Sequence, residues 1–366
     1  MYKTIREGQA LIKVPIEDKI SRKLPVFYNP LMKFNRDVSI LILNALKKSR
    51  LNIADPLAGT GIRSIRFSKE LLRYDEININ DCSKKAVRII KENITLNGLK
   101  GLKVSCMDAN DFLYHSKGFD YIDVDPFGSP NPFLETAIKR LSREGILAIT
   151  ATDTAPLCGT YHLACRRKYW AEPMRNELMH EIGLRILIRK VQLVAAQLDK
   201  ALFPLLSFSK DHYFRIFFKS SKSKAHVNKI LGHHLFFHYC NQCMNRETSD
   251  LNTKMCCGAR MILAGPLWSG QIISPEIIRE MLNVNTIPET QKTLETFLQE
   301  SSLQVVGFFD LSIIAKKRLC KVPPSLRVVE HLKQLGFEAC KTHFGGIKTN
   351  APAQVVVDIA RRVAGD

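Results

Sequence analysis

Short apolar runs alternate with amphipathic stretches along the first half of the chain. Five runs, at 51–59, 76–81, 102–108, 119–128 and 145–153, each end in Asp or Gly. Stretches with helical spacing of apolar residues lie between them, at 62–72 and 83–98. Strands that alternate with amphipathic helices predict an α/β fold, in which a parallel sheet is covered on both faces.

The second half of the chain has a different pattern. Residues 202–211 and 212–220 read as two adjacent strands, which we expect to form a hairpin at the sheet edge. The polar, basic segment Ser220–Lys224 then reads as a linker. With 366 residues the chain is long enough for two domains. We therefore expect a Rossmann-like domain at 1–222 and a smaller α+β domain at 223–366.

A glycine-containing turn follows the first predicted strand. It reads Asp55-Pro-Leu-Ala-Gly59-Thr-Gly61, and the two glycines allow close approach of the backbone to a ligand. Taken alone, this turn would also fit a dinucleotide enzyme. The third glycine of the dinucleotide pattern is replaced by Ser64, which argues against a pyrophosphate-binding turn.

The next two strand ends also carry acidic residues. Asp81 ends the second strand, at about the offset where a carboxylate binds ribose hydroxyls. Asp108 and Ala109 follow the third strand, placed to meet an adenine amino group. Each Asp could instead be a helix N-cap. Because ligands bind at the carboxyl ends of parallel strands, the three ends together favour an adenosine-type cofactor.

The fourth strand runs into Asp125-Pro126-Phe127-Gly128. This resembles the D/N-P-P-Y/F motif of methyltransferases that act on exocyclic amines of nucleobases. Such an amine is a poor nucleophile, and a carboxylate with a backbone carbonyl can hold its hydrogens and direct its lone pair. Pro126 removes a competing N–H donor. Phe127 offers a face to a base turned out of its stack. The alternative is an Asp-Pro turn with a buried Phe.

The whole chain resembles the family of tRNA guanine-26 N2-dimethyltransferases of archaeal type. The resemblance runs through EGQALIKVP, FYNPLMKFNRD, DPLAGTGIRSIRF, DPFGSP, LCGTYHLACRRKYW, HEIGLRIL, GPLW and GGIKTNAP. It implies a class I methyltransferase domain that uses S-adenosyl-L-methionine to methylate guanosine 26 of tRNA twice.

The resemblance also implies roles for single residues. Asp125 would accept the amine, and Phe27 and Phe127 would sandwich the base. Arg36 and Arg63 would line the cofactor pocket together with Asp81, Asp108 and Ala109, with Arg36 a partner for the methionine carboxylate. From the residues alone, both arginines could equally be surface charges.

The chain carries 54 basic and 35 acidic residues, a net charge of +19, which suits a polyanionic partner. Arg166, Arg167 and Lys168 are consecutive and precede Tyr169 and Trp170. Basic residues beside aromatics suit RNA. The alternative is a solvated basic turn. We expect these three residues to bind tRNA.

Four cysteines fall within a short segment, at Cys240, Cys243, Cys256 and Cys257. The Cys240-x-x-Cys243 pair resembles half of a zinc knuckle. The second half departs from the usual spacing, because vicinal cysteines share a metal only with a strained local geometry. His238 could replace one of them. We expect a structural zinc, with reduced, metal-free thiols as the alternative.

No stretch reaches the roughly 18 apolar residues of a membrane helix, and the N-terminus has no apolar signal region. We expect a monomeric cytoplasmic enzyme. Two other functions remain open: methylation of exocyclic amines in rRNA or DNA, and RNA binding without catalysis.

Overall fold

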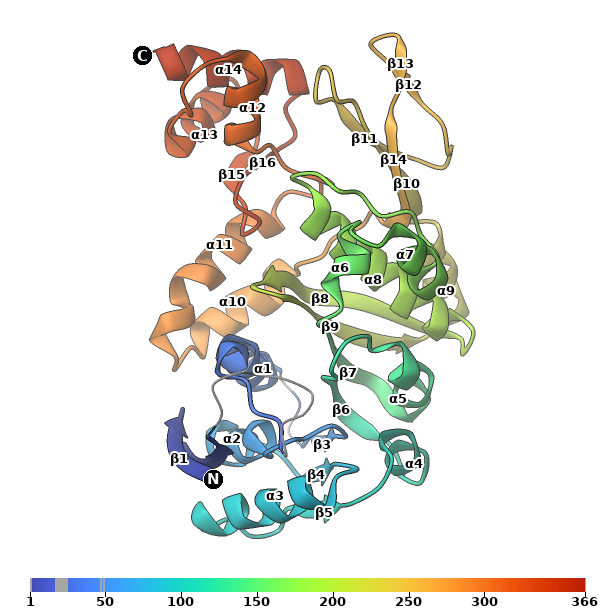
Figure 1. Cartoon of the computed structure of the whole chain (residues 1–366), viewed down its shortest axis with the longest axis vertical. Helices are drawn as coiled ribbons and strands as arrows, with labels where there is room; N and C mark the ends of the chain where they lie inside the picture. The colour runs from blue at the N-terminus through green and yellow to red at the C-terminus, as the bar shows by residue number, and fades with distance from the viewer. Residues whose placement is uncertain (1, 17–25, 47, 49, 366) are drawn as a thin grey trace.

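The computed structural model describes residues 2–16, 26–46, 48 and 50–365. A seven-stranded sheet lies at the centre of the N-terminal part (Figure 1). Its strands are β3 (Asn52–Asp55), β4 (Glu76–Asn80), β5 (Lys103–Ser105), β6 (Phe119–Val124), β7 (Leu141–Ala151), β8 (Lys200–Lys210) and β9 (Tyr213–Lys222). The order is β5-β4-β3-β6-β7-β9-β8, with parallel pairing from β5 to β7. This confirms the predicted parallel sheet. From β3 the chain adds β4 and β5 on one side and then returns to add β6 and β7 on the other side, so the order of the strands reverses between β3 and β6.

Helices cover both faces of this sheet, as the alternating pattern predicts. Figure 1 shows the first two helices to the left of the sheet and the fourth and fifth to the right. The helices of this part are α1 (Lys33–Ala45), α2 (Ile62–Glu70), α3 (Lys84–Leu96), α4 (Ala109–Tyr114), α5 (Leu134–Arg140), α6 (Thr154–Leu157), α7 (His162–Tyr169) and α8 (Met179–Ala196), with short 3-10 turns at Pro30–Met32 and Asn131–Phe133. A hairpin of β1 (Tyr2–Glu7) and β2 (Ala10–Pro15) packs on α2 and α3.

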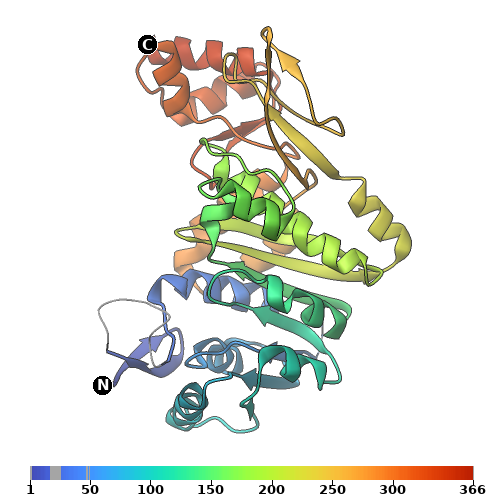
Figure 2. The same ribbon diagram turned by 45° about the vertical axis from the view of Figure 1, so that its right-hand side comes forward.

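The predicted hairpin at the sheet edge is present, but the predicted linker is not. Strands β8 and β9 pair antiparallel from Lys210 and Tyr213 at the turn to Lys200 and Lys222 at the far end. The polar residues 220–222 therefore belong to a strand, because the backbone of β8 supplies their hydrogen bonds. Ser223 then caps α9 (Lys224–Leu231), which carries the chain to the C-terminal region (Figure 2).

The C-terminal region is α+β, as predicted. Its first part is an antiparallel sheet of order β11-β10-β14 with a small hairpin, β12–β13, inserted in it. The elements are β10 (His234–Tyr239), β11 (Arg246–Ser249), β12 (Met255–Cys256), β13 (Ala259–Arg260), β14 (Ile262–Trp268), α10 (Pro275–Asn283), a 3-10 turn at Pro288–Thr290, α11 (Gln291–Ser301), α12 (Leu311–Arg318), α13 (Ser325–Gln334), β15 (Ala339–Lys341), β16 (Ile347–Thr349) and α14 (Ala353–Gly365). Helix α10 returns to pack on α1.

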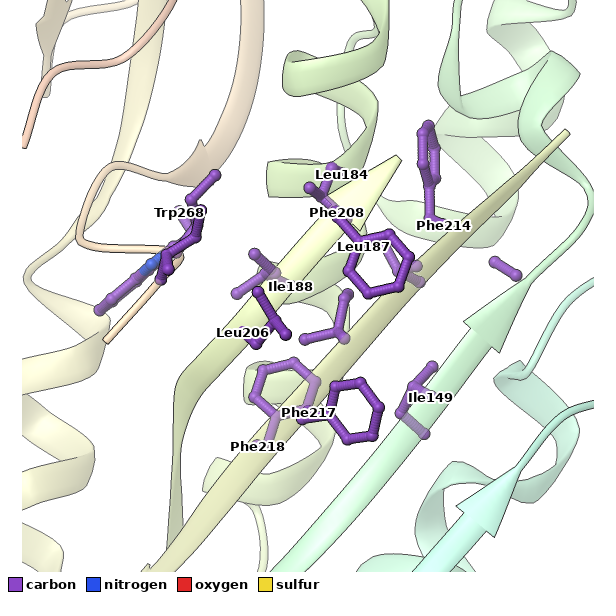
Figure 3. Packing of buried hydrophobic residues seen from close by; sticks show 14 of the residues in the cluster. Ile149, Leu184, Leu187, Ile188, Leu206, Phe208, Phe214, Phe217, Phe218 and Trp268 are labelled. Carbon is purple, nitrogen blue, oxygen red and sulfur yellow. The ribbon is translucent and has the colours of Figure 1, made fainter. Parts of the chain in front are cut away.

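The main hydrophobic core is continuous between the two parts. Helix α8 turns Leu184, Leu187 and Ile188 toward the aromatic residues of β8 and β9 (Figure 3). The spacing of these three residues places them on one face of the helix. Trp268 of β14 closes the cluster from the C-terminal side and is 5% exposed. Packing therefore fixes the C-terminal region against the edge strands of the sheet.

Candidate active site at the carboxyl ends of the strands

Hydrogen bonds join the carboxyl ends of β3, β4 and β5. Asn80 is fully buried, and its side-chain amide donates to the carbonyls of Pro56 (3.1 Å) and Met107 (3.0 Å). Its side-chain oxygen accepts from the N–H of Met107 at 3.1 Å. Asn80 was not among the predicted site residues, although a polar residue at the end of the buried strand EININ is a signal for such a role.

The glycine turn after β3 and the acidic end of β4 meet, as predicted. The N–H of Gly59 donates to Asp81 at 2.9 Å, and the N–H of Ser83 donates to its other oxygen at 2.9 Å. Gly59 and Gly61 have φ of +56° and +75°, which favours glycine. A Cβ at Gly59 would lie 2.8 Å from the carbonyl oxygen of Phe27. The turn therefore needs glycine to pack against the Phe27 segment.

Asp55 has a different environment from the other strand ends. It is buried and accepts a hydrogen bond from the hydroxyl of Ser64 at 2.8 Å, so the residue that replaces the third glycine holds this carboxyl. Burial raises the pKa of Asp55 to about 7, against the opposing charge of Arg63. Asp55 thus lies beneath the turn.

Asp108 is exposed and caps α4, where its carboxylate accepts from the N–H groups of Asn110 (2.8 Å) and Asp111 (3.4 Å). The N-cap interpretation is therefore correct for this residue. Ala109 is buried directly beside it. Asp108 and Asp81 both stand at the strand-end edge where the sequence places an adenosine-type ligand.

Arg36 is buried in a cluster of charges that the sequence did not reveal. Its guanidinium makes two hydrogen bonds of 2.6 Å to the carboxylate of Glu7. Arg66 binds the same carboxylate at 3.0 Å and Asp37 at 2.7 Å. Burial would raise the pKa of Glu7, but the hydrogen bond and charge of Arg36 and the charge of Arg66 lower it. Arg36, which we expected to bind the carboxylate of the cofactor, is thus already paired with the carboxylate of Glu7.

Asp125 stands at the end of β6 and binds Arg63, which is buried at the start of α2. Arg63 also lies 3.3 Å from Asp123 and donates to Ser39 at 2.9 Å. Asp123 in turn accepts from Arg215 at 2.9 and 2.7 Å. Asp125 is therefore the outermost member of a buried charge network that extends inward through the sheet. Its members alternate in charge and are Asp125, Arg63, Asp123 and Arg215.

The positive and negative charges of this buried charge network balance one another. Asp123 and Arg215 are fully buried. Burial alone would raise the pKa of Asp123, but Arg215 and Arg63 lower it. Removing one partner from such a group leaves an uncompensated buried charge, which is strongly destabilising. Arg215 was not among the predicted site residues, although a lone arginine in the apolar strand YFRIFF is a signal for a buried charge.

The Asp125-Pro126-Phe127 segment lines a cavity of about 160 Å³. Phe27 lies across from Phe127, with ring centroids 4.1 Å apart and planes at 65°. The structure therefore brings the two predicted rings together, but edge to face, so a base must part them to lie between them. The other lining residues are Asn29, Leu31, Met32, Thr152, Asp211, His212 and Tyr213.

The basic segment ends α7 and lies beside the loop that follows Asp125-Pro126-Phe127-Gly128. Tyr169 is fully buried, and its hydroxyl contacts Asp153 (2.7 Å) and Ser129 (3.0 Å), just after Gly128. Tyr169 is therefore not available to stack on RNA, contrary to the expectation for this aromatic. Trp170 is 48% exposed, with the ammonium of Lys190 over its ring.

Arg166, Arg167 and Lys168 are exposed on this helix end. Arg166 pairs with Glu172 and Lys168 lies 3.4 Å from Asp153. Surface ion pairs of this kind are weak and can be exchanged for a phosphate at small cost.

The four cysteines converge into one group. Their sulfurs all lie within 4.8 Å of one another, with Cys243 and Cys256 3.5 Å apart and Cys256 and Cys257 3.8 Å apart. Zinc binds thiolate sulfur at about 2.3 Å, so four sulfurs around one ion lie about 3.8 Å apart. The donor set fits a tetrahedral Cys₄ zinc site.

A tight turn explains how adjacent cysteines reach the same point. Cys257 and Gly258 join β12 to β13 and have φ of +52° and +75°, the combination of a two-residue hairpin turn. Burial would raise the pKa of Cys240, but the backbone N–H groups of Cys243 and Gln242 bring it to about 7. His238 is buried apart from the group and contacts the carbonyl of Leu251 at 2.9 Å, so it replaces no cysteine.

The family model of N2,N2-dimethylguanosine tRNA methyltransferases matches residues 8–361. The chain belongs to this family. It is 41% identical to the tRNA (guanine(26)-N(2)/guanine(27)-N(2))-dimethyltransferase of Aquifex aeolicus, over 96% of this chain and 94% of that protein. It is 39% identical to the tRNA (guanine(26)-N(2))-dimethyltransferase of Methanobrevibacter smithii, over 99% and 98%.

A solved structure of the same family has the same fold. The structure of Trm1 from Pyrococcus horikoshii in complex with S-adenosyl-L-methionine is similar with a TM-score of 0.87 and 34% identity, covering 98% of this chain and all of that one. The family and the class I methyltransferase fold inferred from the motifs are thus confirmed. Within the described residues, no helix is long and apolar enough to cross a membrane.

Proposed function

We propose that this chain transfers methyl groups from S-adenosyl-L-methionine to the exocyclic N2 of guanosine 26 in tRNA, one after the other. The observation that carries the proposal is Asp125, a carboxylate at the end of β6 in a cavity with two phenylalanine rings. The family to which the chain belongs supports the same reaction.

Asp125 and the carbonyl of Pro126 act on the amine. Arg63 binds Oδ2 of Asp125, so we assign Oδ1 to a hydrogen of the guanine amine. The carboxylate orients the lone pair and stabilises the positive charge that develops on the nitrogen. Phe27 and Phe127 hold the base after it leaves its stack. S-adenosyl-L-methionine, when bound, supplies an electrophilic methyl group.

The same residues support a second transfer. Each transfer replaces one N–H hydrogen of the amine, and the carboxylate of Asp125 is placed to accept the proton released. A singly methylated amine therefore keeps one hydrogen, which is enough for one carboxylate oxygen. Leu31 and Met32 give the cavity apolar walls that can contact a methyl group. After two transfers the nitrogen has no hydrogen for Asp125, so the reaction ends at the dimethylated base.

Residues at the other strand ends would hold the cofactor. We assign Asp81 to the ribose hydroxyls and Asp108 with Ala109 to the adenine, with Gly59 and Gly61 forming the adjacent turn and Asp55 supporting it from below. Arg63 and Arg36 complete the pocket. Binding through Arg36 requires Glu7 to share that guanidinium with the methionine carboxylate.

The remaining assignments concern tRNA and zinc. Arg166, Arg167 and Lys168 bind phosphates beside the base pocket, and region 223–366 extends the tRNA-binding surface. Cys240, Cys243, Cys256 and Cys257 hold a structural zinc in that region. We infer a monomer that acts in the cytoplasm, where tRNA is the substrate.

Nucleoside mass spectrometry of treated tRNA tests the proposal. Incubation of the pure protein with unmodified tRNA and S-adenosyl-L-methionine should yield N2-methylguanosine and then N2,N2-dimethylguanosine at position 26. A matched tRNA with adenosine at position 26 should yield neither there. Equal activity on short rRNA or DNA strands would favour the alternative substrates, and binding without any methylation would contradict catalysis.

A further inference from the structure

One buried hydroxyl in the base cavity makes no hydrogen bond to any described residue. Tyr213 begins β9, directly after the turn formed by Asp211 and His212, and lines the same cavity as Asp125, Phe27 and Phe127. The side chain is 3% exposed, and its hydroxyl is buried. A buried polar atom without a partner costs free energy, so its retention at a site calls for a specific explanation.

The surroundings hold the ring in place but leave the hydroxyl unpaired. Tyr213 meets Phe208 edge to face, with centroids 6.2 Å apart, and the backbone of Lys210 pairs with it across the hairpin. Burial raises the pKa of Tyr213 well above its ordinary value; the charge of Arg215 opposes this rise and the charge of Asp125 adds to it. The phenol therefore remains protonated at neutral pH and can donate a hydrogen bond.

We propose that Tyr213 is a substrate-binding residue whose hydroxyl donates to a ring acceptor of the guanine, O6 or N3, while Asp125 accepts from the amine. This rests on the proposed assignment of the cavity to the target base. In guanine, N3 is bonded to the carbon that carries the amine, and O6 is on C6, on the far side of N1. A hydrogen bond to either acceptor, together with the contact of Asp125 to the amine, fixes the rotation of the base. The turn at Asp211 and His212 thus becomes one wall of the base pocket.

Tyr213→Phe tests this role because it removes only the hydroxyl. We expect kcat/KM for tRNA to fall roughly 10- to 100-fold, since the base acceptor loses its donor in a buried site. Affinity for S-adenosyl-L-methionine should be unchanged. The thermal midpoint should stay equal or rise, because the hydroxyl has no partner in the free protein.

Tyr74→Phe is the matched control. Its hydroxyl pairs with Ser68 at 2.9 Å near the amino end of β4, away from the cavity. This variant should lose a little stability and keep full activity. A Tyr213→Phe protein with wild-type kcat/KM would overturn the proposal.

Base analogues at position 26 identify the contact. 2-Aminopurine lacks O6, and 3-deazaguanine lacks N3, while both keep the amine. Wild-type enzyme should be less active on the analogue that lacks the contacted acceptor than on guanosine. Tyr213→Phe, which has no hydroxyl to make that contact, should be equally active on that analogue and on guanosine. Equal losses for both proteins on both analogues would contradict the contact. Asp125→Asn separates the two proposals: full activity of that variant would reject the cavity assignment itself, and with it the role of Tyr213.

Discussion

Replacing Lys348 by Met should destabilise the junction between the two parts of the chain. Lys348 of β16 is 1% exposed, and its ammonium lies 3.2 Å from Glu181 of α8 and 3.1 Å from Glu300 of α11. Removing one partner of a buried ion pair costs about 3–5 kcal/mol. Glu181 keeps Arg185 at 2.9 Å and Glu300 keeps His343 at 2.7 Å. We therefore expect the lower end of that range, about 3 kcal/mol.

Urea unfolding followed by tryptophan fluorescence measures this loss, since the buried Trp268 lies at the junction and its carbonyl accepts from Arg185. The matched control is Lys139→Met, which breaks an ion pair with Glu135 whose side chains are 50% and 67% exposed. That change should cost about 0.3–0.5 kcal/mol. A loss below about 1 kcal/mol for Lys348→Met would refute the reasoning, because it would match a surface pair.

The effect of Lys348→Met should also depend on pH. Burial would raise the pKa of Glu181 and of Glu300, but the neighbouring cations lower both in the folded protein. Their contribution to stability is therefore complete above the ordinary glutamate pKa of about 4.3 and is lost as the pH falls through the lowered values. The difference between wild type and Lys348→Met should be largest at neutral pH and shrink in acid.

Two further predictions concern RNA and zinc. Changing Arg166, Arg167 and Lys168 to Ala should weaken tRNA binding and reduce the slope of log K against log salt by about 0.7–0.9 for each lost phosphate contact. An unchanged slope would show that these three residues are solvated surface charges that do not contact phosphates. Metal analysis should find about one zinc per chain, and chelation should loosen region 223–366 while cofactor affinity persists. A stable, metal-free protein would show that the four cysteines are only clustered thiols.

The sequence predicts the parallel sheet because each of its strands ends at a recognisable polar or glycine residue. The same ends predict where the site lies, since parallel strands bring their carboxyl ends to one edge. Asp81, Asp125 and the two glycines accordingly lie along that edge. The predicted linker at 220–224 failed because local polarity does not show whether a neighbouring strand supplies backbone partners.

The partners of the buried charged residues could not be predicted from the sequence, for a related reason. Glu7, Arg215 and Lys348 each find their charged partners more than 25 residues away, on elements that only the folded chain brings together. A sequence can show that a charged residue interrupts an apolar strand, but not which carboxylate will meet it. Tyr213 could not be predicted for the same reason, because only the folded structure shows that its buried hydroxyl has no hydrogen-bond partner among the described residues.

The most direct test of the central claim is single-turnover methyl transfer to guanosine 26 by Asp125→Asn. The substitution keeps the shape of the side chain but replaces an acceptor-only carboxylate by an amide. Loss of such a preorganised electrostatic contact should lower the rate about 10²–10³-fold, while tRNA and cofactor still bind. Asp125→Ala should be at least as slow. A rate for Asp125→Asn within a few-fold of wild type would show that another residue receives the amine.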